Sequence, residues 1–144
     1  MPGGWNNPRP VDEAVAPPGA GRCSVLVADD HAALRSAISD ALRAHGYAVE
    51  EAADGHVALE VLRTLRPRAA VIDVRMPGID GLQVCASAVR ERLPCSMIVM
   101  SVVADAETRR RVAELGAAFH EKPFELPSLL ADVQRACNDS PALP

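Results

Sequence analysis

Short apolar runs of this sequence lead directly into polar side chains that could share one ligand. The runs SVLVA, AAVID, SMIVMS and AAFHE end on, or are followed by, Asp29 and Asp30, Asp73, Ser101 and Lys122, respectively. Three converging carboxylates repel one another, and a hard divalent cation such as Mg²⁺ relieves that repulsion. A carboxylate can also attack phosphorus, while an ammonium group neutralises the transferring phosphoryl group. These residue types therefore indicate phosphoryl transfer, provided that the fold brings them together.

The segment DVRMPGIDG, residues 73–81, turns sharply after Asp73, because a proline and two glycines follow. Such a turn lets backbone carbonyls face a metal held by Asp73. Taken singly, the residues also have ordinary structural explanations: Asp30 could cap a helix, and Lys122 could be a solvated surface charge. Their joint position at strand ends favours the functional interpretation.

The apolar runs alternate five times with segments whose apolar residues recur at helical spacing, which predicts a (βα)5 chain. Strands are expected over residues 24–28, 47–52, 69–73, 96–101 and 117–121, and the first three helices are expected to be capped by Asp30, Asp54 and Asp80. Strands that are apolar throughout suit a parallel sheet covered by helices. The leading fold is therefore α/β: a doubly wound, five-stranded parallel sheet of order 2-1-3-4-5, flavodoxin-like. Its ligand site lies at the carboxyl ends of the strands.

Composition narrows the class of protein. The 144 residues allow one domain, and 49% hydrophobic with 24% charged residues is ordinary for a globular chain. Aromatic residues make up 3% and the net charge is −4, which disfavours base stacking and direct nucleic-acid binding. We expect a Pro/Gly-rich disordered tail over residues 1–22, a globular domain over 23–138, and a tail or linker stub over 139–144.

The four cysteines, Cys23, Cys85, Cys95 and Cys137, are irregularly spaced and belong to no C-x-x-C motif. This spacing disfavours metal binding through thiolates. We expect small core or near-surface thiols in a reducing cytoplasm. No apolar run reaches the roughly 18 residues of a membrane span, and no signal-peptide pattern opens the chain. The expectation is a cytoplasmic protein with no membrane contact.

Four pieces of the sequence together resemble the receiver domain of response regulators in two-component signalling. They are VLVADDHAALR, VIDVRMPGIDGL, VMS and GAAFHEKPFE, in that order, and the resemblance covers residues 23–138. It implies that Asp73 is the phosphoacceptor. It also implies a Mg²⁺ site formed by Asp29, Asp30, Asp73 and the backbone carbonyl of Arg75.

The same resemblance implies roles in switching for three further residues. Ser101 would be the switch hydroxyl, Lys122 the phosphate-binding lysine, and Phe119 the aromatic ring that turns inward when Ser101 moves toward the phosphoryl group. Val102 departs from the family pattern, in which a small residue usually follows the switch hydroxyl. With Val103 it would crowd the approach to Asp73 and slow access for small donors or water.

The implied function is a phosphoacceptor switch rather than an enzyme. It would take its phosphoryl group from a sensor histidine kinase or a phosphotransfer protein. It would control a downstream protein partner through its fourth helix, fifth strand and fifth helix, and dimerisation on phosphorylation stays open. Arg109, Arg110 and Arg111 lie near that surface and could meet an acidic partner or simply be solvated.

Two other functions remain as alternatives: a binding-only pseudo-receiver and a phosphatase of the haloacid-dehalogenase type. A pseudo-receiver would be expected to lack the acidic pocket, Asp73 or Lys122, and all are present. The phosphatase class expects a second aspartate two residues after the nucleophile, where this chain has Arg75. A flavin site is weaker still, because no Gly/Ser/Thr-rich phosphate loop follows the first strand.

Overall fold

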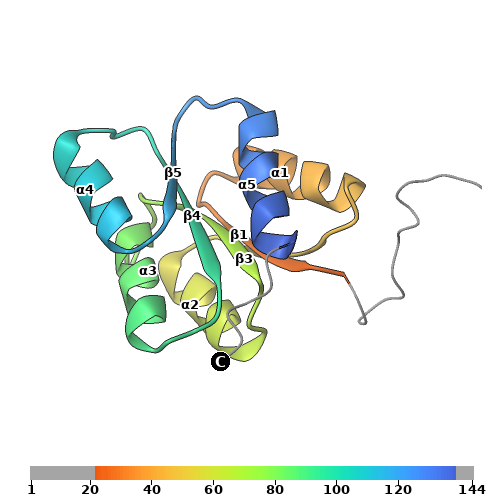
Figure 1. The fold of residues 1–144 in the computed structure, drawn as a ribbon, viewed down its shortest axis with the longest axis horizontal. Helices are drawn as coiled ribbons and strands as arrows, with labels where there is room; N and C mark the ends of the chain where they lie inside the picture. Colours follow the sequence, from red (N-terminus) through yellow and green to blue (C-terminus); the bar gives the residue numbers. More distant parts are fainter. Residues whose placement is uncertain (1–21, 139–144) are drawn as a thin grey trace, which may run out of the picture.

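The computed structural model describes residues 22–138, which form one parallel sheet with helices on both faces (Figure 1). The five strands lie in the order β2-β1-β3-β4-β5, which confirms the predicted fold class. The elements are β1 (Ser24–Ala28), α1 (Ala32–Ala44), β2 (Ala48–Ala52), α2 (Gly55–Thr64), β3 (Ala69–Asp73), α3 (Gly81–Arg90), β4 (Ser96–Ser101), α4 (Ala106–Glu114), β5 (Ala118–Glu121) and α5 (Leu126–Asn138). The expected tails, over residues 1–22 and 139–144, lie outside the described residues except for Arg22.

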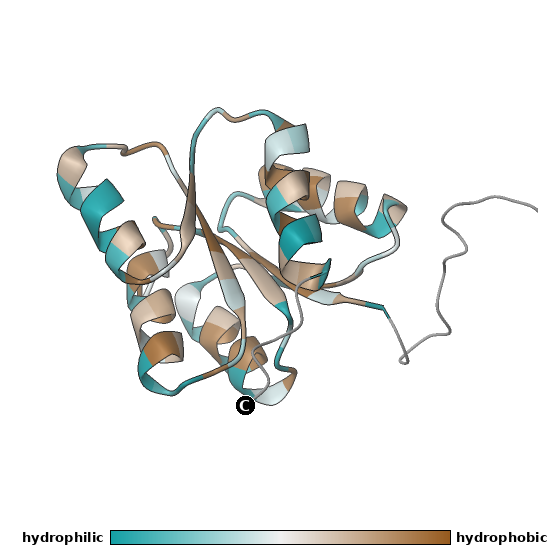
Figure 2. Cartoon of the chain, viewed as in Figure 1, coloured by the Kyte–Doolittle hydropathy of each residue, from teal (hydrophilic) through white to brown (hydrophobic). Residues whose placement is uncertain are grey.

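The sheet divides the core into two apolar layers, because side chains alternate between its faces. Val25 and Val27 of β1 pack with α1 and α5, whereas Leu26 and Ala28 pack with α2, α3 and α4. Figure 2 shows the same arrangement, with apolar residues concentrated in the central strands. Within the described range, no helix is long and apolar enough to span a bilayer.

Side-chain caps fix where the helices begin. Asp54 and Asp80 cap α2 and α3 as predicted, and Asp80 forms a reciprocal capping box with Gln83. The predicted cap at Asp30 is wrong: the N-cap of α1 is His31, whose Nδ1 accepts the backbone N–H of Leu34 at 3.2 Å. The reason is that α1 begins one residue later than expected, which leaves the Asp30 carboxylate to the acidic pocket described below.

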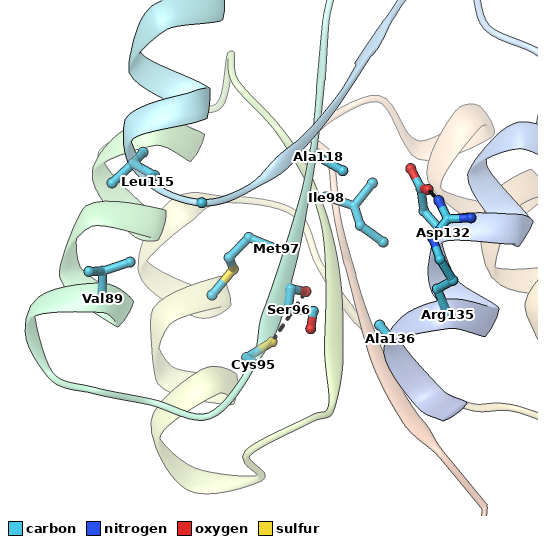
Figure 3. Close-up of a pocket in the computed structure, with 11 residues that line it drawn as sticks. Val89, Cys95, Ser96, Met97, Ile98, Leu115, Ala118, Asp132, Arg135 and Ala136 are labelled. Carbon is cyan, nitrogen blue, oxygen red and sulfur yellow. Dashed lines mark hydrogen bonds and ion pairs between the residues drawn. The ribbon is translucent and has the colours of Figure 1, made fainter. Parts of the chain in front are cut away.

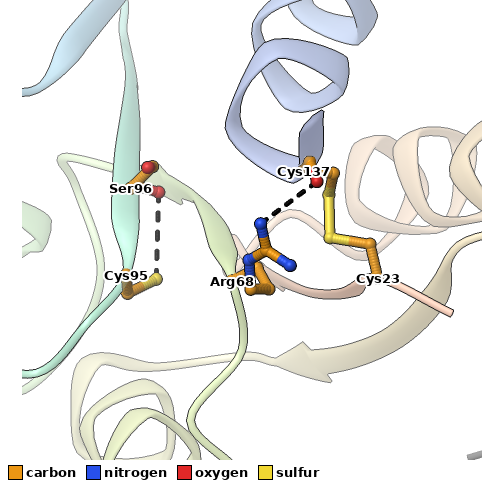
Figure 4. Close-up of a disulfide and its surroundings, with 5 residues drawn as sticks. All are labelled: Cys23, Arg68, Cys95, Ser96 and Cys137. Atoms are coloured by element: carbon orange, nitrogen blue, oxygen red, sulfur yellow. Dashed lines mark hydrogen bonds between the residues drawn. A yellow bond between two sulfur atoms is a disulfide. The ribbon is translucent and has the colours of Figure 1, made fainter. Parts of the chain in front are cut away.

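A disulfide joins Cys23, just before β1, to Cys137 in the last turn of α5 (Figure 4). The expectation of four thiols is therefore wrong for this pair, and Cys85 and Cys95 remain free. The pairing arises because α5 runs back across the sheet toward the amino end of β1, so residues 114 positions apart bring their Cα atoms within 5.9 Å. The bond closes almost the whole domain into one ring.

Replacement of both half-cystines, Cys23→Ser with Cys137→Ser, should lower the free energy of unfolding. A cross-link that closes a ring of this length restricts the unfolded chain by about 4–5 kcal/mol in the chain-entropy description. Urea denaturation of the oxidised protein and the double variant measures the difference. Cys95→Ser, which breaks no cross-link, is the matched control. Equal midpoints for the oxidised protein and the double variant would contradict the prediction.

Candidate functional site

The predicted site residues meet at the carboxyl edge of the sheet. Asp29 follows β1, Asp73 ends β3 and Ser101 ends β4, and Lys122 comes directly after β5. These strands are neighbours in the order β1-β3-β4-β5. Parallel pairing thus carries four side chains from distant parts of the sequence to one edge, as the topology predicted.

Three carboxylates form a compact acidic pocket there. One ligand oxygen from each of Asp29, Asp30 and Asp73 lies within 4.8 Å of the others. Asp29 and Asp73 are buried, with 0% and 5% of their surface exposed, whereas Asp30 is open to solvent. The backbone N–H of His31 donates to Asp29 Oδ1 at 2.9 Å, which orients that carboxylate.

The Lys122 ammonium bridges the two buried carboxylates. Its Nζ lies 3.1 Å from Asp29 Oδ2 and 3.0 Å from Asp73 Oδ1. One positive charge against three negative ones leaves the pocket with an excess of negative charge when all of these groups are ionised. Oxygen donors with such an excess match the preference of Mg²⁺, so the residues present fit this ion.

Burial and neighbouring charges shift the pKa values of both partners. Desolvation raises the pKa of Asp73, and the charges of Asp29 and Asp30 add to this, although the hydrogen bond from Lys122 opposes it. Desolvation also disfavours the charged form of Lys122, but its contacts with Asp73 and Asp29 outweigh that cost and raise its pKa. The arrangement therefore keeps the lysine charged beside a carboxylate that is costly to ionise.

Two glycines let the loop after Asp73 pack tightly. A Cβ on Gly81 would lie 2.2 Å from the backbone oxygen of Asp73, and a Cβ on Gly55 would lie 2.0 Å from the backbone oxygen of Ile79. Both positions therefore require glycine. The N-terminal ends of α2 and α3 press on the loop in this way, and fix the backbone that follows the acidic pocket.

An open groove of ≈ 570 Å³ lies between the exposed Asp30 carboxylate and this loop. The exposed residue Arg75 and its neighbours form its wall; the lining residues are Asp30, Val74, Arg75, Met76, Pro77 and Asp80. Asp30, the solvent-exposed carboxylate of the acidic pocket, thus forms part of the groove's lining.

Ser101 is buried at the end of β4, and its hydroxyl oxygen accepts the backbone N–H of Val103 at 2.9 Å. Its backbone oxygen accepts the N–H of Lys122 at 2.8 Å, which ties the ends of β4 and β5 together. Val102 is 59% exposed, so its side chain is turned to solvent rather than into the core.

Phe119, the predicted switch aromatic, is partly buried against the layer formed with α2, α3 and α4. The Arg109 guanidinium lies 4.9 Å from the centre of its ring, a cation–π contact. Arg109 also donates to the backbone oxygen of Ala104 at 3.0 Å and to Glu121 Oε1 at 3.3 Å. The Arg109 side chain of α4 thus contacts the Phe119 ring, the end of β5 and the loop after Ser101.

Sequence reasoning considered Arg109 only as a surface charge, since nothing in its spacing marks a contact with Phe119. The cluster of Arg109, Arg110 and Arg111 is exposed, but part of its positive charge is paired with glutamates of the domain. Arg110 pairs with Glu107 and Glu114 on the same helix, at 2.6 Å and 2.7 Å. Because these glutamates already match the charge of Arg110, its role is better explained by a solvated surface than by binding of an acidic partner.

A second linkage between β5 and α5 was not anticipated. His120 Nε2 lies 2.5 Å from Asp132 Oδ2, and its ring meets the Phe124 ring edge-on with centroids 6.0 Å apart. Arg135 also contacts the Asp132 carboxylate. The sequence offered no signal for this group, because its members come close only when α5 packs on the edge strand.

The comparisons with known proteins agree with this geometry. The model of the response regulator receiver domain matches residues 25–134. The chain belongs to the response regulator receiver domain family. Its members are signalling switches rather than classical enzymes, and they generally use Mg²⁺ at an acidic pocket.

Three similar proteins illustrate the match. The response regulator MprA of Mycolicibacterium vanbaalenii is 39% identical over 112 residues, which are 74% of this chain and 47% of MprA. The receiver domain of the putative response regulator NarL from Mycobacterium tuberculosis is 30% identical with a TM-score of 0.75, covering 83% of this chain and 98% of that domain. The BeF3-activated receiver domain of DrrB is 25% identical with a TM-score of 0.74, covering 82% and 99%. The chain spans about half the length of the curated relatives it matches.

Asp73→Asn should raise the free energy of unfolding by about 1 kcal/mol at pH 7.5 without Mg²⁺. Because the folded-state pKa of Asp73 is raised, ionisation of this carboxyl costs stability above its unfolded pKa, near 3.9. The gain should therefore shrink as the pH falls toward 4, where the carboxyl becomes protonated in both states. Urea denaturation at several pH values checks this.

Asp40→Asn, on the exposed side of α1, is the control and should change stability little at any pH. A loss of stability in Asp73→Asn at pH 7.5 would show that the Lys122 contact outweighs burial and repulsion, against the prediction.

Proposed function

We propose that this receiver domain is a phosphoacceptor switch that carries its phosphoryl group on Asp73. The observation that carries the proposal is the Lys122 ammonium, held between the buried carboxylates of Asp73 and Asp29, next to the exposed Asp30. An acceptor carboxylate, a cation for the phosphoryl oxygens and a set of metal-binding oxygens thus occur together.

The proposed cofactor is Mg²⁺, held by Asp29, Asp30, Asp73 and the backbone carbonyl of Arg75. When bound, it would neutralise charge on the phosphoryl oxygens during transfer. The residues of the chain perform the other tasks. Lys122 contacts the incoming group, and the groove beside Asp30 admits the donor.

In the proposed reaction, a carboxylate oxygen of Asp73 attacks the phosphorus of a phosphohistidine, on a sensor histidine kinase or a phosphotransfer protein. The new bond is an acyl phosphate, and the phosphorus–nitrogen bond breaks to release the histidine. We place this exchange in the cytoplasm, where two-component receivers meet their donors.

The proposed switch begins at Ser101. Its hydroxyl now accepts the N–H of Val103, and a phosphoryl group on Asp73 offers it a competing partner. Movement of Ser101 would pull the loop that Arg109 binds at Ala104, and would free Phe119 to turn inward. The consequence is a population shift on the α4-β5-α5 surface, read by a downstream protein partner or by a second copy of the chain.

Two observations bear on the alternatives. Arg75 lies on the exposed wall of the groove, where a phosphatase would need an acid/base carboxylate. The complete pocket around Asp73 disfavours a binding-only role. The activation of the DrrB receiver by BeF3, a phosphoryl-like ligand, adds support from a similar fold.

Intact-protein mass after incubation with Mg²⁺ and phosphoramidate, whose phosphorus–nitrogen bond resembles that of phosphohistidine, tests the proposal. We expect one phosphoryl group on the protein and none on Asp73→Asn, because the attacking oxygen is lost. Asp105→Asn, which alters only the cap of α4, is the matched control and should be phosphorylated.

A Mg²⁺-dependent thermal shift, and a second one with BeF3, read binding at the pocket without chemistry. The switch is contradicted if a folded protein gains neither adduct nor thermal shift, which would support the binding-only role. Steady release of phosphate from para-nitrophenyl phosphate would instead support the phosphatase.

Val102→Ala should shorten the lifetime of the phosphorylated form several-fold. Val102 is exposed next to Ser101, and we propose that it and Val103 shield the acyl phosphate from water. Loss of the phosphoryl group is followed by mass after removal of the donor. Val57→Ala, at an exposed valine of α2, is the control. Equal lifetimes for Val102→Ala and the unmodified protein would rule out this role.

A further inference from the structure

The Cys23–Cys137 disulfide lies at the end of the sheet opposite the acidic pocket, where β1 begins and α5 ends (Figures 1 and 4). Both residues are partly exposed, so a reductant can reach the bond without unfolding of the domain. The Arg68 guanidinium donates to the backbone oxygen of Cys137 at 3.1 Å, so a positive charge lies next to the Cys137 backbone. A nearby cation stabilises a departing thiolate.

The two other cysteines, Cys85 and Cys95, are free thiols that we expect to react slowly. Burial raises the pKa of Cys85 to about 12, and that of Cys95 to about 12. Since thiolates are the reactive species, these two thiols do not compete in exchange at neutral pH. Within the described part of the chain, Cys23 and Cys137 are thus the cysteines that we expect to exchange at neutral pH.

The last turn of α5 depends on this bond for its position. Only Leu129 and Val133 of α5 are fully buried, whereas Ala136 and Cys137 lie at the edge of the apolar layer. Ala136 and Arg135 also border an open hollow of ≈ 370 Å³ beneath the start of β4 and β5, so the helix end has little packing on that side (Figure 3). The disulfide to Cys23 is the covalent restraint on these residues, beside the apolar contacts of Ala136 and the Arg68 hydrogen bond.

We propose that Cys23–Cys137 is a reversible thiol–disulfide exchange site that controls how firmly the end of α5 is held. The substrate class is a dithiol reductant. One of its thiolates attacks a sulfur of the bond, and the outgoing cysteine leaves as a thiolate that takes up a proton. The second thiol of the reductant resolves the mixed disulfide, which yields two protein thiols and one oxidised reductant.

In the cytoplasm, where we place the protein, thiol reductants reduce accessible disulfides. A bond placed within reach of solvent in that compartment would respond to the redox state, whereas a buried one would persist. Reduction would leave the acidic pocket intact and loosen the end of α5, from which the following chain departs. Because the proposal needs no chemistry at Asp73, it stands or falls separately from the proposed function.

The test is reduction of the folded full chain with dithiothreitol, followed by rapid alkylation and mass mapping of peptides. We expect alkylation at Cys23 and Cys137, little at Cys85 or Cys95, and re-formation of the bond with oxidised glutathione. Amide hydrogen exchange over residues 134–138 should accelerate at least tenfold on reduction, at labelling times short enough that β1 and β3 stay unexchanged in both redox states.

Cys23→Ser with Cys137→Ser should show the fast exchange with or without reductant, while Cys95→Ser should respond as the unmodified protein does. Two outcomes would overturn the proposal: a bond that is reduced only after denaturant is added, or equal exchange of the α5 end in the two redox states. Failure of oxidised glutathione to restore the bond in folded protein would overturn its reversibility.

Discussion

The contact of one ammonium with two buried carboxylates is the constraint on which the rest of the domain depends. Asp29 and Asp73 lie buried at the ends of adjacent strands, and burial together with the neighbouring negative charges raises the pKa of Asp73. Lys122 offsets part of that shift, but it reaches both groups only because β5 lies in register at the edge of the sheet. The sheet thus maintains a cluster of charges that is unfavourable by itself, and this unfavourable charge is what makes it suited to a metal ion and a phosphoryl group.

The two loops beside the pocket differ in rigidity. The loop after Asp73 is held by close backbone packing, whereas the loop after Ser101 is held by only a few side-chain contacts. Gly55 and Gly81 permit close packing of the loop after Asp73, which leaves little freedom there. The loop after Ser101 is instead held by the Ser101 hydroxyl and by Arg109. Each of these contacts is worth at most a few kcal/mol, so new contacts to a phosphoryl group are large enough to replace them. This contrast between a rigid loop and a weakly held one is what the proposed switch requires.

The opposite end of the sheet is organised by a covalent bond rather than by charge. The disulfide brings the first and last described elements together, and α5 is common to that end and to the proposed output surface. His120 and Asp132 anchor the middle of α5 to β5, while Cys137 anchors its end. Beside the burial of Leu129 and Val133, α5 is thus restrained by the His120–Asp132 contact in its middle and a disulfide at its end.

The sequence by itself determined the (βα)5 order, the 2-1-3-4-5 sheet and the convergence of Asp29, Asp73, Ser101 and Lys122, because hydrophobic periodicity and parallel topology leave few alternatives. The caps at Asp54 and Asp80 were also predictable, because in each case an aspartate directly precedes a segment with helical spacing. The tertiary structure alone decided which cysteines pair, that Arg109 lies over Phe119, and that His31 rather than Asp30 caps α1. The disulfide and the Arg109 contact depend on how helices settle on the sheet to within a few ångströms, which the spacing of residues along the chain does not encode. The cap depends on the exact residue at which α1 begins, which hydrophobic periodicity does not resolve.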